Sequence, residues 1–113
     1  MTDIPFGAIV LTDFPFTDLS AVKRRPALVI STDNALRTDI IVAYITSVQN
    51  TNRFAAAIVP SLANGLKVPS LVRFDKIATI DKRIIAGRMG SADPDWLSRN
   101  RDAFFSVFGF ARS

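Results

Sequence analysis

The sequence predicts a mainly β domain, built as a small barrel with one C-terminal helix. Apolar stretches of about five to eight residues recur through most of the chain, as short strands do. Clusters rich in Asp, Asn, Ser, Thr and basic residues separate them, and such clusters are typical of turns. Near the C-terminus the apolar residues change to the spacing of an amphipathic helix.

The predicted strands follow one another at short intervals. They are GAIVLTDF at 7–14, PALVIS at 26–31, DIIVAYIT at 39–46, FAAAIVP at 54–60 and PSLVRFD at 69–75, then a short strand ending in a polar turn at Asp81 and Lys82. Asn64 and Gly65 form a strong turn signal before 69–75. No repeat and no linker is evident, so we expect residues 1–113 to form one domain.

Asp93 and Pro94 predict the start of the helix, as N-cap and first-turn residue. The residues on its apolar stripe are Trp96, Leu97, Ala103, Phe104, Val107, Phe108 and Ala111. Aromatic rings there could stack on bases, but a face this apolar is far more often core or dimer interface. We therefore expect the helix to pack on the barrel.

Composition limits the chemistry that this chain can perform. There is no Cys, no His and no Glu, and all ten acidic residues are Asp. Disulfides, thiolate zinc sites and a cysteine nucleophile are excluded, and acid–base chemistry must come from Asp, Arg, Lys, Tyr44, hydroxyls or water. A metal site would need scattered Asp and carbonyl groups, and no calcium-loop spacing is present, so we expect no metal and no cofactor.

Net charge and hydropathy bear on partners and location. The chain has 14 Lys and Arg against 10 Asp, a net charge of +4 with a pI near 10.1, which attracts polyanions such as nucleic acid. No apolar run approaches the ~20 residues that span a bilayer, and the opening MTDIPFG has neither the basic head nor the apolar stretch of a signal peptide. We expect a cytoplasmic protein with no membrane partner.

The segment SLVRFDKIATIDK, residues 70–82, alternates like a half-buried strand and carries Arg73 and Asp75 on one face. Side chains at i and i+2 of a strand lie roughly 6.6 Å apart. The two groups can therefore pair with each other or flank a group the size of a phosphate. The spacing alone allows both.

Two more clusters adjoin predicted strands. Lys23, Arg24 and Arg25 precede Pro26 and can neutralise phosphates, although a solvated basic turn is the more ordinary interpretation. Thr46 and Ser47 end the strand at 39–46 and can donate hydrogen bonds to a phosphate, although both residue types are common at strand ends and turns.

Taken together, these segments resemble the MazF/PemK (Kid) family of toxins from bacterial type II toxin–antitoxin systems. The resemblance covers nearly the whole chain. It rests on Gly7 with AIVLTDF, then PFTD, KRRPALVIS, IIVAYITS and SLVRFDKIATIDK, in that order and at the family's usual spacing. The most specific parts are RRPALVIS and the block ending in TIDK.

The resemblance implies an SH3-like, partly open β-barrel with a C-terminal helix, usually a homodimer. It implies a metal-independent endoribonuclease that cuts single-stranded RNA through its 2′-hydroxyl, leaving a 2′,3′-cyclic phosphate and a 5′-hydroxyl. A cognate antitoxin, whose disordered segment wraps across the active-site face, holds such toxins inactive, and the complex can bind operator DNA. By similarity, Arg73 and Asp75 match the catalytic pair, Arg25 the arginine before the proline, and Thr46 with Ser47 the hydroxyl pair.

Chemistry suggests roles for these residues. Asp75 is the candidate base, Arg73 and Arg25 stabilise transition-state charge, and Thr46 and Ser47 orient the phosphate. The general acid is harder to name, because a guanidinium with a pKa above about 12 releases its proton reluctantly. Bases would meet the loop 47–54, where the candidates to bond and stack are Asn52, Arg53 and Phe54.

The chain departs from the family pattern at two places. Ala8 stands where many members have an acidic residue, and Leu19-Ser20-Ala21-Val22 replaces a Gly-Ser-Glu-Gln or Gly-His-Glu-Gln loop. The second departure favours an alternative, a non-catalytic family member that binds an antitoxin or DNA as a regulatory module. A module for proline-rich peptides is a third possibility, but one Tyr and one Trp supply few of the exposed aromatics it requires.

Overall fold

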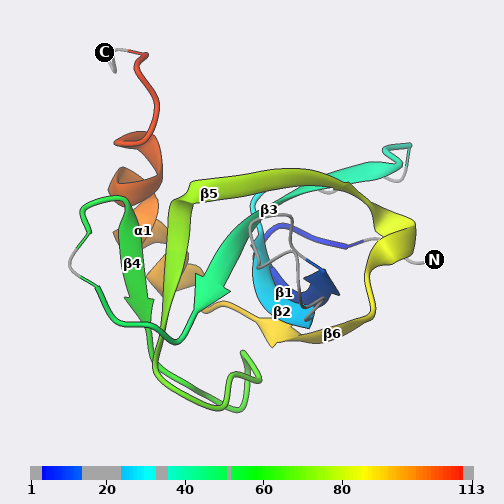
Figure 1. Cartoon of the computed structure of the whole chain (residues 1–113), viewed down its shortest axis with the longest axis horizontal. Helices are drawn as coiled ribbons and strands as arrows, with labels where there is room; N and C mark the ends of the chain where they lie inside the picture. Colours follow the sequence, from blue (N-terminus) through cyan, green and yellow to red (C-terminus); the bar gives the residue numbers. More distant parts are fainter. Residues whose placement is uncertain (1–3, 14–23, 33–35, 51, 111–113) are drawn as a thin grey trace, which may run out of the picture.

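The computed structural model describes residues 4–13, 24–32, 36–50 and 52–110. Within them the chain forms six strands, a 3₁₀ turn and one α-helix (Figure 1). In chain order these are β1 (Ala8–Asp13), β2 (Arg24–Val29), β3 (Asp39–Thr46), β4 (Ala55–Ile58), β5 (Ser70–Asp81), the 3₁₀ turn η1 (Lys82–Ile84), β6 (Gly87–Ser91) and α1 (Pro94–Phe105).

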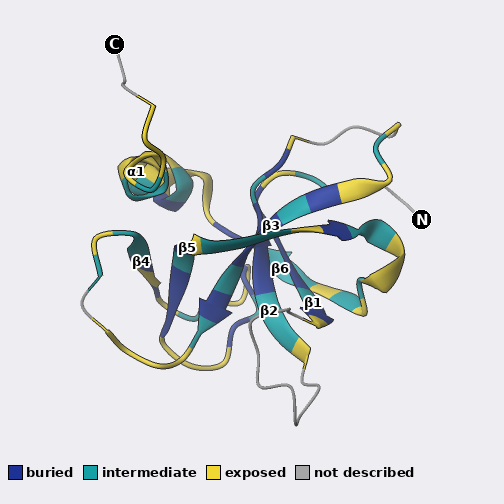
Figure 2. Ribbon diagram, turned by 45° about the horizontal axis from the view of Figure 1, so that its top comes forward, coloured by how far each residue is buried: buried dark blue, intermediate teal, exposed yellow. Residues whose placement is uncertain are grey.

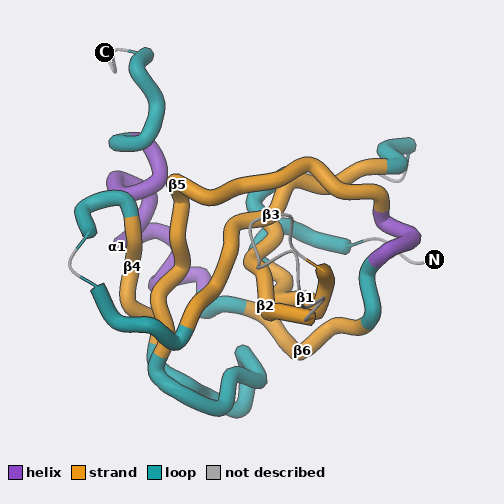
Figure 3. The backbone as a smooth tube through the Cα atoms, in the orientation of Figure 1, coloured by secondary structure: helices purple, strands orange, loops and turns teal. Residues whose placement is uncertain are grey.

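The strands form one sheet in the order β4-β5-β3-β2-β1-β6, and every neighbouring pair is antiparallel. The sheet curls into a half-barrel, and α1 lies against its β4–β5 end (Figure 3). The predicted class, a mainly β, SH3-like and partly open barrel with a C-terminal helix, is confirmed. No helix in the described part of the chain has the length and apolar character to span a membrane.

Alternation along the strands divides the buried residues between the two faces of the sheet. One face packs under α1 through a first cluster that includes Leu28, Val72 and Phe74, and it also buries Trp96 of the helix. The indole Nε1 of Trp96 donates to the carbonyl of Ala57 on β4 at 2.8 Å, which fixes α1 to the sheet. Figure 2 shows this burial in the middle of the strands and on the inner side of α1.

The other face buries a second cluster near the β1–β2–β3 part of the sheet. Its members include Val10, Ala27, Val29 and Val42, and Tyr44 packs partly against it. These residues alternate with those of the first cluster, so both faces of the same strands are apolar over part of their length. Where the second cluster stops, polar side chains take over the same face.

A register shift bends β5 next to these polar side chains. Ala43 of β3 lies opposite Ile77, but the next residue, Tyr44, lies opposite Arg73. Residues 74–76 therefore have no partner on β3, and β5 turns sharply there (Figure 1). Such bulges re-aim side chains. Here the bulge frees Asp75 from the β3 ladder.

The structure corrects three details of the predicted elements. β5 is one continuous strand, where the sequence predicted 69–75 and a second short strand. β6 was not predicted, because GRMGS lacks apolar alternation; it forms as the partner of β1. The helix was expected to extend to Ala111, but it ends at Phe105, where bonds of the i→i+3 type from Val107 and Phe108 close the last turn. Ala111 itself lies outside the described residues.

Three predicted turn and cap signals in the second half of the chain are confirmed. Asp93 caps α1, its carboxylate accepting from the Asp95 amide at 2.8 Å. Asn64 and Gly65 form the predicted turn, with Gly65 at φ +73°. Asp81 ends β5 and caps η1 through the Arg83 amide.

Candidate active site

Arg73 and Asp75 of β5 form a two-point ion pair. Arg73 Nε donates to Oδ1 at 2.8 Å and Nη2 donates to Oδ2 at 2.7 Å. The side chains remain 18% and 25% exposed, so solvent or a ligand can reach both. Of the two arrangements that the spacing allowed, the structure shows the pair.

This pairing changes the acidity of both groups. The hydrogen bond from Arg73, followed by the Arg73 charge, lowers the pKa of Asp75 despite partial burial. The same hydrogen bond and charge raise the pKa of Arg73. Asp75 is therefore a weaker base in this arrangement than a free aspartate, and it gains basicity when Arg73 turns to another anion.

Asn52, in the loop between β3 and β4, also contacts Asp75. Its side-chain amide makes a hydrogen bond that further lowers the pKa of Asp75. Its Oδ1 accepts from the Phe54 amide at 2.8 Å, which folds the loop into a tight turn. A residue predicted to meet RNA bases is thus bonded directly to the candidate base.

Arg53 and Phe54 lie beside Asn52 at the start of β4. The Arg53 guanidinium stands over the Phe54 ring, 4.7 Å from its centroid. The Phe54 carbonyl accepts from the amide of Phe74 at 3.0 Å, so this turn is fixed to the bulge of β5. Arg53 is exposed and Phe54 is half-buried, an arrangement that leaves a cation and a ring face at the rim of the site.

Arg25 projects from the same face of the sheet. It lies two residues before Ala27, whose Cα is opposite Tyr44, and Tyr44 in turn is opposite Arg73. Residues directly opposite one another share a face, as do residues two apart. Among the described residues, the buried Nε of Arg25 has no hydrogen-bond partner. A buried donor left in this way costs about 1–3 kcal/mol unless a ligand or water accepts from it.

Thr46 and Ser47 end β3 on the Leu71 side of the site. The Thr46 Oγ1 accepts from the Val48 amide at 3.1 Å, so its oxygen stabilises the local turn while its hydrogen can still be donated. Ser47 is exposed, and its carbonyl accepts from the side-chain Nε2 of Gln49 at 3.4 Å. Thr46 and Ser47 therefore stabilise the local turn, as such residues commonly do, and their hydroxyl hydrogens remain able to bind a ligand.

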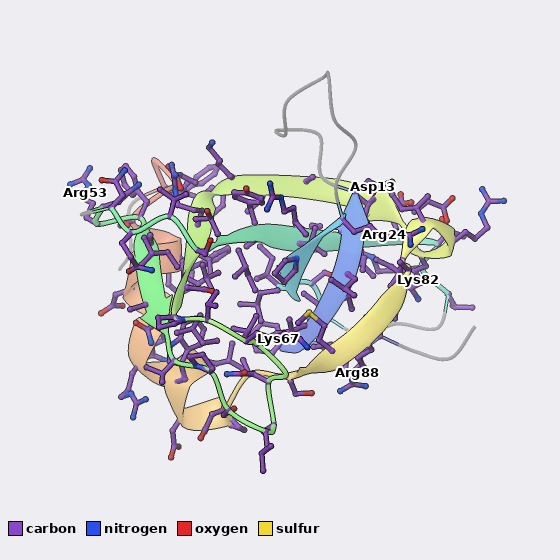
Figure 4. The ribbon with its side chains drawn as sticks, turned by 60° about the horizontal axis from the view of Figure 1, so that its bottom comes forward. Asp13, Arg24, Arg53, Lys67, Lys82 and Arg88 are labelled. Carbon is purple, nitrogen blue, oxygen red and sulfur yellow. The ribbon has the colours of Figure 1, made fainter. Side chains whose placement is uncertain are left out.

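Arg24 and Arg25, the described part of the basic run before Pro26, are successive residues of β2 and so point to different faces of the sheet. Arg24 is exposed and lies opposite Asp13 of β1. Figure 4 places Arg24 and Arg53 on opposite sides of the molecule, so Arg24 does not join the rim formed by Arg53 and Phe54. Lys23 and the loop from Leu19 to Val22 lie outside the described residues.

Comparison with known proteins identifies the family. Residues 6–106 match the model of the PemK-like, MazF-like toxins of type II toxin–antitoxin systems. The chain belongs to this toxin family. No curated protein sequence matches it.

Solved structures of similar fold include proteins from mycobacteria and from Deinococcus radiodurans. A mycobacterial endoribonuclease in complex with its cognate antitoxin has a TM-score of 0.78 at 19% identity, covering 97% of this chain and 99% of that one. MazF from Deinococcus radiodurans has a TM-score of 0.76 at 23% identity, covering 97% and 100%. Mycobacterium tuberculosis toxin MazF-mt6 has a TM-score of 0.75 at 20% identity, covering 93% and 99%. At such identities the likeness is one of fold.

Two features of the site in this MazF/PemK-family chain were not predicted. Tyr44 was only one of several possible acid–base groups in the sequence, yet it stands between the strands that carry Arg25 and Arg73. Lys76 lies over it, with Nζ 5.9 Å from the ring centroid. Two-residue alternation places Tyr44 and Thr46 on one face, but the register that brings Arg73 opposite Tyr44 depends on the bulge, which no sequence signal marks.

Proposed function

We propose that this MazF/PemK-family chain is an endoribonuclease that cuts single-stranded RNA at a short sequence without a metal ion. The attacking group is the RNA's own 2′-hydroxyl, and the products carry a 2′,3′-cyclic phosphate and a 5′-hydroxyl. The observation that carries the proposal is the constellation on one sheet face, where Asp75 is bonded to Arg73 and Asn52 and the same face bears Arg25.

The ion pair suggests how the reaction begins. A phosphate entering between the arginines competes with Asp75 for the Arg73 guanidinium, which binds planar or tetrahedral oxyanions through two donors. As Arg73 turns to the phosphate, Asp75 loses the interaction that lowers its pKa and becomes a better acceptor for the 2′-hydroxyl proton. Substrate binding would thus activate the base.

The remaining predicted residues have supporting roles in this proposal. The Nε of Arg25 gains the acceptor that it lacks among the described residues, and both arginines stabilise the charge that develops on phosphorus oxygens. Thr46 donates its hydroxyl hydrogen to the phosphate, and Ser47 does so from the exposed end of β3. Arg53 and Phe54 receive a neighbouring base by stacking.

We also propose the partners that the family suggests. A mycobacterial endoribonuclease of similar fold was solved with its cognate antitoxin, and we infer an antitoxin for this chain as well, with operator DNA reached through that complex. We infer a homodimer because Phe105, Phe108 and Phe110 are exposed near α1, and such side chains favour association. We infer a cytoplasmic location from the proposed substrate.

The proposal is tested by incubating long RNA of mixed sequence with the protein in EDTA and mapping the fragment ends. Wild type should cut at one short motif and leave cyclic-phosphate ends, and Asp75→Asn should cut about 10²–10⁴-fold more slowly. Asp81→Asn is the matched control, because Asp81 pairs with Arg83 in the same i, i+2 fashion at the other end of β5. Intact RNA with several wild-type preparations would exclude the nuclease.

One observation favours a second candidate, a non-catalytic module that binds an antitoxin or DNA. Both carboxylate oxygens of Asp75 are held by Arg73, and its pKa is lowered, which suits a structural ion pair. This candidate predicts intact RNA together with polyanion binding that weakens with salt and survives Asp75→Asn.

A further inference from the structure

Tyr44 occupies the middle of the candidate site. Its Cα lies opposite Ala27 of β2 on one side and opposite Arg73 of β5 on the other. Its side chain packs partly against the second apolar cluster and is half-buried. A phosphate held between Arg25 and Arg73 would therefore lie over the phenol.

Two cations adjoin this phenol. Lys76 Nζ lies 5.9 Å from the centroid of the ring. Arg73 lies directly opposite Tyr44 in the register of β3 and β5, so its guanidinium and the phenol share one face of the sheet.

The proposed reaction needs an acid that none of the predicted site residues supplies well. Breaking the bond from phosphorus to the 5′-oxygen requires a proton for that oxygen. Guanidinium groups release a proton only above about pH 12, whereas phenols in general do so near pH 10. The chain has one phenol, and it is at this site.

We propose that Tyr44 is the general acid that protonates the leaving 5′-oxygen, an inference that rests on the proposed RNA cleavage. Its place between the arginine-bearing strands puts Tyr44 on the sheet face that bears Arg25 and Arg73, and packing against the second cluster limits the motion of the ring. Asp75 and Tyr44 then act as a base and acid pair from neighbouring strands.

The step balances in atoms and charge. The 2′-hydroxyl proton passes to Asp75 as the 2′-oxygen forms its bond to phosphorus. The bond from phosphorus to the 5′-oxygen breaks, its electron pair stays with that oxygen, and the oxygen takes the Tyr44 proton. The products are the cyclic phosphate, the 5′-hydroxyl, a neutral Asp75 and a Tyr44 phenolate. Water then returns the proton from Asp75 to Tyr44.

The test uses a leaving group that needs no acid. Two versions of the RNA that wild type cuts are compared, one natural and one with sulfur in place of the bridging 5′-oxygen, since a thiolate leaves without protonation. Tyr44→Phe keeps the ring, and a thermal melt confirms that it is folded. It should cut the natural RNA at least about 100-fold more slowly than wild type and the sulfur RNA within about threefold of wild type. Asp75→Asn should slow both.

Other results overturn the proposal in distinguishable ways. Equal losses on both RNAs would give Tyr44 a binding or structural role, and no loss on either would remove it from the reaction. Lys76→Met is the matched control, and if it rather than Tyr44→Phe loses only the natural RNA, the acid is Lys76. A wild type that cuts neither RNA overturns the proposed function itself, and the role of Tyr44 with it.

Discussion

Arg73 holds both carboxylate oxygens of Asp75 from two residues away on the same strand, with donor–acceptor distances of 2.8 and 2.7 Å. In a flat strand the backbone positions of residues i and i+2 lie roughly 6.6 Å apart. The bulge at 74–76 bends β5 between Arg73 and Asp75 and helps their side chains to meet. The two side chains are bonded to each other and are still partly exposed to solvent. A phosphate can therefore reach Arg73 and replace the Asp75 carboxylate there, as the proposed reaction requires.

Arg73→Lys should separate charge from geometry. Lysine keeps the positive charge but has no planar fork, so RNA cleavage should fall about 100-fold or more. Stability should change by no more than about 1 kcal/mol, because the pair is partly exposed to solvent. Cleavage rates and urea unfolding measured on the same samples check both. Arg83→Lys should leave cleavage unchanged, and wild-type rates in Arg73→Lys would rule out a two-point contact in catalysis.

Acid should weaken the fold through its paired aspartates. The pKa of Asp75 is lowered by Arg73, and that of Asp81 is lowered to about 2 by Arg83. A carboxylate whose pKa is lowered on folding stabilises the protein above its unfolded pKa, near 4, and this stabilisation is lost as the pH falls toward the folded pKa. The difference in urea midpoint between wild type and Asp75→Asn should therefore shrink between pH 6 and pH 2. A constant difference would contradict the pairing.

Asn52→Asp should raise the pKa of Asp75. The new carboxylate can still accept from the Phe54 amide and preserve the turn, but it replaces an amide donor to Asp75 with a second negative charge. Carboxyl NMR titration of Asp75 checks the shift. Asn50→Asp, two residues before Asn52 in an exposed part of the loop, should move it much less. An equal shift in both variants would mean that the amide of Asn52 does not bind Asp75.

Gly90→Ala should destabilise the fold by about 1–3 kcal/mol, since the added Cβ would collide with the Ala63 carbonyl and the loop would have to move. Gly87→Ala, in the same strand, is the matched control, because an added Cβ there has no atom of the described residues within 4 Å. Thermal unfolding of both variants checks the difference. Equal melting temperatures would mean that the loop does not pack closely on β6.

Local patterns predicted much of this fold, because they report on single segments. Alternation found β1 to β4 and the start of β5, and Asp93 with Pro94 marked the start of α1. β6 was not predicted, because it forms by pairing with β1 and carries no apolar alternation of its own. The end of α1 was predicted too late in the chain, because the apolar residues after Phe105 keep the helical spacing although the helix has ended.

The candidate site was predictable only in part for the same reason. That Arg73 and Asp75 share a face follows from their spacing, and the structure adds that they bond to each other. That Asn52 reaches Asp75 and that Tyr44 faces Arg73 depend on strand register and on a bulge, which are set by the whole sheet. Arg24 and Arg25 are adjacent in sequence, but strand alternation sends them to different faces of the sheet.

The hydrogen bond from Trp96 to Ala57 also bears on aggregation through the edge of the sheet. β4 is a terminal strand, and the carbonyl of Ala57 bonds to the indole rather than to a neighbouring strand. A bare carbonyl at a sheet border offers a template on which a foreign strand can add, and such addition leads to aggregation. The indole occupies that position. Trp96→Phe should therefore sediment as larger species at concentrations where wild type does not, while Leu62→Ala, fully exposed in the following loop, should behave like wild type.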